Sequence, residues 1–385
     1  MSAFLLSGLT GLLFAFPLNL ALRSGVFLAV AFIAAPTLRR SSGARSHQFW
    51  LLCLLAVLAL PVFVYLFPTL DLPLLSAHAR TVPLETGLGS MSPAGETQSL
   101  SVSSAPYSER AEMPDSAPGT VAWSLWMAGA WAIGSCFCIL RLMLGMAATY
   151  AKTRRAQAMN DAEWVALLEE ARERIGVRRQ VRLLVGASEE IPMTWGVLKS
   201  TILLPPSAMS WPLPQKRAVL EHELAHVKRA DVTAQLVAQL ACALYWFNPL
   251  TWRATARLSI SAERACDDLV LAAGARPSEY ADHLLAMLRT MRFAPASPLI
   301  SAAMAHHSSL EQRVRSLLDP RQDRQAPSRR VRALLLGAIA TLGILSGTLQ
   351  PIARAEEATQ QLIVAPNVAA LNPETKAQWQ AEGIT

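Results

Sequence analysis

The chain has 385 residues, of which 52% are hydrophobic and only 16% are charged. This composition, with a mean hydropathy of +0.29, indicates an integral membrane protein. The five cysteines exclude a disulfide framework, because three lie in apolar segments and two in a predicted cytosolic segment where thiols stay reduced. The net charge of +7 comes mostly from basic clusters beside apolar segments, which favours a topology signal over a nucleic-acid surface.

Residues 1–70 are predicted to contain two membrane-spanning helices. The first is placed at about 17–38, with 3–22 as the alternative, because Arg23 divides an apolar region that is too short for two spans. The second, at 48–70, carries no charged residue and is long enough to cross the hydrocarbon core. A cleaved signal peptide is disfavoured, since no lysine or arginine precedes the apolar region.

The rest of the chain alternates between polar and apolar segments. Residues 71–120 are rich in proline and serine and are predicted to form an extracytoplasmic loop, and 121–150 contains the third span. The fourth span is placed at 331–353, followed by a short extracytoplasmic tail at 354–385. Basic clusters follow the first and third spans and precede the fourth, which predicts a multi-pass protein of the inner (plasma) membrane with 151–330 as a cytoplasmic domain.

The predicted cytoplasmic domain has a mixed pattern. Residues 161–176 show the periodicity of an amphipathic helix, whereas 180–185 and 195–204 are apolar or alternating and rich in β-branched residues, which predicts strands. An open strand edge can bind a peptide substrate, and a covered internal strand is the equal alternative. The sequence therefore predicts an α+β domain that is mainly helical.

His222, Glu223 and His226 form an H-E-x-x-H motif. Residues four apart share one face of a helix, so both imidazoles can bind one Zn²⁺ while Glu223 reaches a water molecule beside it. The alternative is a pair of ordinary histidines on a helix surface. The motif predicts two zinc ligands and a catalytic base, which is typical of a metallopeptidase.

A catalytic zinc site needs a third protein ligand, and Glu263 is the candidate. It lies on a predicted amphipathic helix one turn before Asp267, so Glu263 can bind metal while Asp267 accepts the free N–H of a ligating histidine. An acidic surface cluster paired with arginines is the alternative. Cys266 is a softer ligand, but carboxylates beside it would raise its pKa, which favours a packed core thiol. Tyr280 and His283 are further candidates for stabilising the oxyanion.

An uncharged run at 232–250 separates the motif from Glu263. Hydropathy alone predicts a span there. A complete crossing, however, would put Glu263 on the opposite side of the membrane from the motif, and the three ligands could not share one ion. We therefore predict a buried or partly re-entrant helix that ends at Asn248.

Several segments together resemble the BlaR/MecR-type membrane metallopeptidases, which are bacterial sensor-transducers. The segments that carry the resemblance are L-E-H-E-L-A-H-V-K-R-A-D at 220–231, Y-W-F-N-P-L at 245–250, E-R-A-C-D at 263–267, P-M-T-W-G at 192–196, I-L-L-P at 202–205 and S-L-E-Q-R-V at 309–314. The resemblance spans roughly residues 17 to 350. It implies an α-helical membrane protein with a zincin (gluzincin-like) domain, in which His222, His226 and Glu263 bind zinc and Glu223 is the catalytic base.

Members of this family lead to the inactivation of a cytosolic transcriptional repressor. The resemblance therefore implies a signal-transducing zinc metalloprotease that resides in the lipid bilayer, has a winged-helix repressor as its partner and makes no direct contact with nucleic acid, with homo-oligomerisation left open. Antibiotic sensors of the family continue into a penicillin-binding domain, which we do not expect here because the chain ends soon after its last apolar run. The alternatives are a constitutive quality-control protease and a non-proteolytic sensor that binds the repressor.

Overall fold

The structure is a computed structural model that describes residues 20–38, 41–66, 70–72, 118–187, 191–291 and 313–351. The described residues up to 66 and those between 118 and 347 belong to one compact unit, which contains the helices and the main sheet. A second unit contains a pair of parallel strands, β1 (Leu70–Leu72) and β6 (Leu349–Pro351). The rest of the predicted extracytoplasmic loop and the tail at 354–385 lie outside the described residues, as does the start of the chain.

Three helices are long and apolar enough to cross a membrane, judged by length and composition among the described residues: Leu20–Leu38, Gly43–Phe63 and Leu125–Arg155. The second belongs to α2 (Gly43–Leu66) and the third to α3 (Pro118–Arg155). The first agrees with the span placed at 17–38, within which residues 35–38 form the short η1 (Ala35–Leu38). The chain thus has the helices of a membrane protein.

Two helices have other bounds than the spans predicted over them, and the span limits themselves stay predictions. The second span was placed at 48–70, but α2 begins at Gly43, because the carboxylate of Asp268 accepts a hydrogen bond from the Gly43 N–H at 3.0 Å and supports a polar first turn. The last predicted span, 331–353, coincides with α10 (Arg329–Thr348), which ends earlier than expected. Pro351 disfavours helix for the residue before it, and the chain continues there as β6. Helix α10 is not among the three span candidates, so the fourth span stays a prediction.

A four-stranded sheet and two helices form the part that precedes the motif. The helix α4 (Ala162–Ile175) is capped by the Asp161 side chain at its start and by Gly176, at φ +78°, at its end. Trp164 and Leu220 are fully buried in the core that α4 shares with the sheet and the following helix. The strands are β2 (Gln157–Ala158), β3 (Val181–Val185), β4 (Met193–Trp195) and β5 (Ser200–Leu204), in the order β2-β3-β5-β4.

The predicted strand at 195–204 is in fact two antiparallel strands, β4 and β5. Gly196 lies between them at φ +93°, and a Cβ there would lie 2.2 Å from the carbonyl oxygen of Lys199, so only glycine fits this turn. The prediction failed because the turn contains no second glycine or proline to mark it. As a result β5 is internal, and β4 is the strand at the sheet edge.

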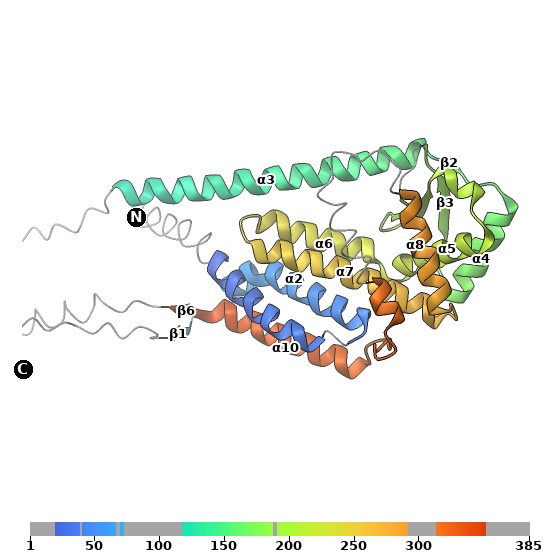
Figure 1. The fold of residues 1–385 in the computed structure, drawn as a ribbon. Helices are drawn as coiled ribbons and strands as arrows, with labels where there is room; N and C mark the ends of the chain where they lie inside the picture. Colours follow the sequence, from blue (N-terminus) through green and yellow to red (C-terminus); the bar gives the residue numbers. More distant parts are fainter. Residues whose placement is uncertain are drawn as a thin grey trace, which may run out of the picture. The chain divides into compact units, whose positions relative to one another are not determined.

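Four consecutive helices follow the 3-10 turn η2 (Pro206–Ser210): α5 (Leu213–Arg229), α6 (Asp231–Leu244), α7 (Pro249–Ala272) and α8 (Pro277–Met291). The apolar run at 232–250 contains α6, which has 14 residues and is shorter than a span. It ends at Leu244, earlier than the predicted Asn248, which instead caps α7. Helices α6 and α7 pack on α2 (Figure 1), with Leu54, Tyr245 and Leu258 in one core.

Candidate metal centre

Helix α5 presents the H-E-x-x-H motif to the interior. Its i, i+4 spacing places the rings of His222 and His226 edge to face, with centroids 4.9 Å apart. The helix is positioned by Leu220 and Leu224, both fully buried against α4 and the sheet. The two imidazoles therefore sit on a rigid element, on the side opposite this core.

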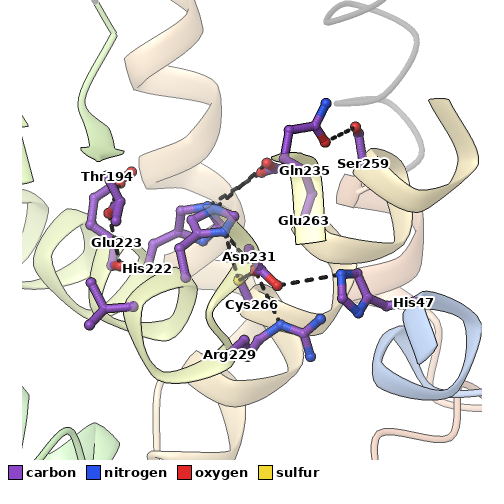
Figure 2. Close-up of polar contacts among 12 residues, drawn as sticks. His47, Thr194, His222, Glu223, Arg229, Asp231, Gln235, Ser259, Glu263 and Cys266 are labelled. Atoms are coloured by element: carbon purple, nitrogen blue, oxygen red, sulfur yellow. Dashed lines mark hydrogen bonds and ion pairs between the residues drawn. The ribbon is translucent and has the colours of Figure 1, made fainter. Parts of the chain in front are cut away.

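Helix α7 brings Glu263 to the two imidazoles (Figure 2). One carboxylate oxygen of Glu263 lies 3.4 Å from Nε2 of His222, and the other lies 3.6 Å from Nε2 of His226. The three ligand atoms fall within 4.8 Å of one another, which would allow one metal ion to touch all three. Two imidazole nitrogens and one carboxylate are also the donor set of many catalytic zinc sites.

Asp231 supports His226 from behind. Its Oδ2 lies 2.9 Å from Nδ1 of His226, so the imidazole donates its Nδ1 proton to Asp231 and keeps Nε2 free to face Glu263. Asp231 begins α6, directly after Ala230, whose φ of +57° turns the chain between the two helices. The sequence analysis did not identify Asp231, although a carboxylate five residues after the second histidine was a signal for it.

His222 has a different support, made by Tyr280 and Asp267. Its Nδ1 lies 2.9 Å from the Tyr280 hydroxyl and 3.3 Å from Oδ1 of Asp267, and the hydroxyl donates to the same Oδ1 at 2.9 Å. Asp267 thus lies on the Nδ1 side of a histidine of the motif, and its role in supporting a metal ligand stays a prediction. Tyr280, proposed from sequence as an oxyanion stabiliser, is buried on the Nδ1 side of His222, away from Glu263.

Arg313 connects Glu263, the third candidate ligand, to Asp267, which supports His222. Its guanidinium pairs with Asp267 through two hydrogen bonds of 2.7 and 2.8 Å and with Glu263 at 2.9 Å. It begins the helical residues 313–318, and only 11% of its side chain is exposed. The sequence assigned no role to Arg313, since nothing local links it to residues fifty positions earlier.

These charges change the pKa values of the site. Burial and Arg313 lower the pKa of His222, but hydrogen bonds to Asp267 and Glu263 outweigh them and raise it to about 9. Burial acts to raise the pKa values of the Glu263 and Asp267 carboxyls. Arg313 and the histidine partners act against burial, so the pKa of Glu263 is well below its ordinary value and the pKa of Asp267 is about 2. Both acids are therefore ionised, and a metal ion must displace a proton from His222.

Glu223 faces the edge strand of the sheet. Its side chain is buried, and the Thr194 hydroxyl on β4 donates a hydrogen bond to its carboxylate oxygen at 2.8 Å. The same hydroxyl lies 3.1 Å from the backbone oxygen of Glu223. Thr194 thereby fixes the carboxylate, another contact that the sequence analysis missed, although Thr194 belongs to the P-M-T-W-G segment.

Cys266 belongs to a second group of metal-binding side chains, with His226 and Asp231. Its sulfur lies 3.3 Å from Nδ1 of His226 and 3.4 Å from Oδ2 of Asp231. Burial, with Asp231 beside it, raises the pKa of the thiol well above its ordinary value, so the group is protonated and donates a weak hydrogen bond. The geometry favours the packed thiol predicted from sequence over a metal ligand.

A cavity of about 810 Å³ opens onto this centre. It is lined by the side chains of the motif, by Glu263, by His283 and by residues 191–195, which include the edge strand β4. It extends along α3 and α6. An H-E-x-x-H helix facing a glutamate, next to an open strand edge and among apolar helices, defines the class: a membrane protein with a peptidase-like site.

The family model described as BlaR1 peptidase M56 matches residues 14–317, and the chain therefore belongs to this family. It is also similar to the regulatory protein BlaR1 of Bacillus licheniformis, with 31% identity over 118 residues. That alignment covers 31% of this chain and 20% of the relative. Because the chain matches a fifth of the relative's length, only the peptidase family follows from the comparisons.

Proposed function

We propose that the chain is a zinc-dependent metalloendopeptidase of the plasma membrane that transduces an extracytoplasmic signal by cleaving, or causing the inactivation of, a cytosolic transcriptional repressor. The observation that carries the proposal is the meeting of His222, His226 and Glu263 around one point, with Glu223 beside them, in a chain of the BlaR1 peptidase family. The Nδ1 atoms of both imidazoles are held by other groups, and both Nε2 atoms face Glu263. The Nε2 atom of His222 also lies 3.5 Å from the Arg313 guanidinium.

The expected reaction is hydrolysis of a peptide bond. Zinc bound by His222, His226 and Glu263 would supply Lewis-acid polarisation of the scissile carbonyl and acidify a water molecule. Glu223 takes the proton from that water and returns it to the leaving amine. Thr194 holds the Glu223 carboxylate in one orientation, and the free edge of β4 offers backbone groups that can pair with the substrate.

A regulatory role is supported by contacts between α2 and the centre. The N–H of Gly43 donates to Asp268, five residues after Glu263, and Nε2 of His47 lies 3.5 Å from Asp231. A shift of α2 in the membrane would therefore reach the carboxylates next to the proposed ligands. The proposed partner is a winged-helix repressor, as the resemblance to the BlaR/MecR-type transducers implies. The name of the relative, a regulatory protein, agrees with a regulatory role.

The test uses the full chain in lipid nanodiscs and, as candidate substrate, any winged-helix repressor encoded beside its gene. Zinc content is measured by mass spectrometry and cleavage by gel and peptide mapping. The Glu223→Gln variant is expected to keep zinc and to lose about 10²–10⁴-fold in rate, and His222→Ala is expected to lose the metal. Glu279→Gln, an exposed change on α8, serves as the matched control. Cleavage by Glu223→Gln at the wild-type rate would overturn the assigned base, and a zinc-free wild-type protein would overturn the metal centre.

A further inference from the structure

The cavity at the metal centre continues as a groove between α3 and α6. On α3 its lining residues are spaced three or four apart and form one face of the helix: Cys138, Arg141, Leu142, Gly145, Met146 and Thr149. On α6 the wall consists of Gln235, Leu236, Gln239 and Cys242. The same cavity is bounded by His222, Glu223 and Glu263, so the groove opens directly onto the proposed catalytic groups.

The groove ends where α3 meets the turn after α6. The indole N–H of Trp131 donates to the carbonyl oxygen of Leu244 at 3.0 Å, and that of Trp246 donates to the carbonyl oxygen of Trp131 at 3.3 Å. Gly134 allows this approach, since a Cβ there would lie 2.3 Å from the Trp246 ring. The two helices are therefore in contact beyond the groove, on the side away from the proposed catalytic groups.

Among the α3 residues that line the cavity, Arg141 is the charged one. Arg141 lies within the span candidate Leu125–Arg155, and it forms no ion pair with any carboxylate in the part of the chain that the structure describes. Charged side chains within membrane helices are costly, and those that occur commonly serve a binding function. The amides of Gln235 and Gln239 on the facing wall add groups that can bond to a peptide backbone.

We propose that this groove binds an extended apolar stretch of the peptide substrate, next to the scissile bond, that carries an acidic residue for Arg141. The proposal rests on the proposed peptidase function. Three features favour a peptide as the occupant: the groove is continuous with the proposed catalytic groups, the edge strand β4 lines the same cavity, and a carboxylate would neutralise Arg141. From Cys138 to Thr149 the α3 wall is about 16 Å long, enough for about five extended residues.

A larger side chain at position 145 could fill the groove without a clash at its Cβ. Gly145 lines the cavity, and a Cβ added there meets no atom within 4 Å. Gly129 on the same helix also has free space around a Cβ, but it does not line the cavity, which makes it the matched control. The probes are fluorescent peptides from the cleaved region of the repressor, each with an added flank Leu-Leu-Asp-Leu-Leu or Leu-Leu-Lys-Leu-Leu, on either side of the scissile bond.

Binding is measured by fluorescence anisotropy on the full chain in nanodiscs. All variants also carry Glu223→Gln, so that the peptide is not cleaved during the measurement. Gly145→Phe is expected to weaken binding of the aspartate-bearing probe at least about tenfold, with unchanged zinc content and unfolding temperature. Gly129→Phe is expected to bind as the parent does. Arg141→Glu is expected to reverse the preference, from the aspartate probe to the lysine probe, which general damage to the fold cannot produce.

The proposal is overturned if Gly145→Phe binds the aspartate probe as tightly as the parent, or if Arg141→Glu keeps the original preference. Co-purification of a phospholipid that is lost in Gly145→Phe, without any effect of the flank on binding, would identify the groove as a lipid site and also overturn it. Failure of the proposed peptidase function has a separate signature, namely absence of zinc or of cleavage in the wild-type protein.

Discussion

At the scale of single residues, the two histidines of the motif have unequal support. His226 bonds directly to Asp231, whereas His222 shares its Nδ1 side with Tyr280 and Asp267, and Arg313 neutralises that acid. A carboxylate that accepts the Nδ1 proton fixes the tautomer and increases the basicity of Nε2. In the proposed zinc site this support would therefore tune metal affinity, and a substitution can weaken it without removing a ligand.

Asp231 is expected to increase zinc affinity through its hydrogen bond with His226. Asp231→Asn removes the negative charge behind His226 while it preserves the side-chain volume, and zinc affinity is expected to fall about 10–100-fold. Competition with a chromogenic chelator measures the change. Asp282→Asn, an exposed substitution on α8, is the control, and equal zinc affinity in the two variants would contradict the role of Asp231.

Thr194 is expected to affect turnover rather than metal binding. Thr194→Val keeps the shape but removes the hydroxyl that bonds Glu223, and a lost hydrogen bond of about 1 kcal/mol corresponds to about a fivefold fall in kcat. Thr194→Ser is expected to restore the rate because it returns the donor. Steady-state kinetics with zinc analysis test this, and a loss of zinc in Thr194→Val would count against an effect on the base alone.

The pH dependence of zinc binding follows from His222. The pKa of the folded His222 imidazole is raised from its ordinary 6.5 to about 9. Protonation of His222 therefore stabilises the folded protein fully below the ordinary pKa of 6.5, and this stabilisation is lost as the pH rises through 9. Zinc must displace the proton, so its affinity is expected to rise about tenfold per pH unit from about 7 to 9 and then to level off. Zinc titrations across this range provide the test. An affinity that is flat below pH 9 would contradict the raised pKa.

At the scale of elements, the helices whose residues show a local periodicity could be predicted from the sequence. The helices α5 and α7 were predictable because their apolar residues recur with helical spacing, and the motif residues on α5 share a face for the same reason. The contacts of Thr194 and Arg313 were not predictable, since each depends on how elements far apart in the sequence pack. The start of α2 was missed because its polar first turn is stabilised by a carboxylate from α7 rather than by its own hydropathy.

Helix α2 packs closely on α7 at Gly43, and a substitution there is expected to disturb both helices. A Cβ on Gly43 would lie 2.4 Å from the backbone nitrogen of Ala265, so Gly43→Ala must push the two backbones apart. We expect this variant to lose about 1–3 kcal/mol of stability and to bind zinc more weakly, since Glu263 lies on the displaced segment. Thermal unfolding in detergent measures the effect. Gly25→Ala, with no atom within 4 Å of its Cβ, is the control and is expected to be neutral.

At the scale of the whole molecule, the apolar helices and the site helices share one core. Buried side chains from the helix at 20–34, from α2 and from α6 and α7 pack together, and the Tyr245 hydroxyl donates to the backbone oxygen of Val57 at 2.6 Å. A fragment of residues 151–330 would expose this core to water. We expect it to aggregate or to elute as large assemblies in size-exclusion chromatography, whereas the full chain in detergent is monodisperse. A soluble, zinc-loaded fragment would contradict this.

The shared core also limits where the chemistry can take place. Because α6 and α7 are buried against α2, cutting the chain between α2 and the proposed peptidase site would remove part of the interior on which the site helices pack. If the proposed function is correct, the enzyme would therefore not act as a released, freely diffusing fragment. Each copy would then process only what reaches it at the membrane, and the number of copies there and the arrival of their target would set the speed of a response.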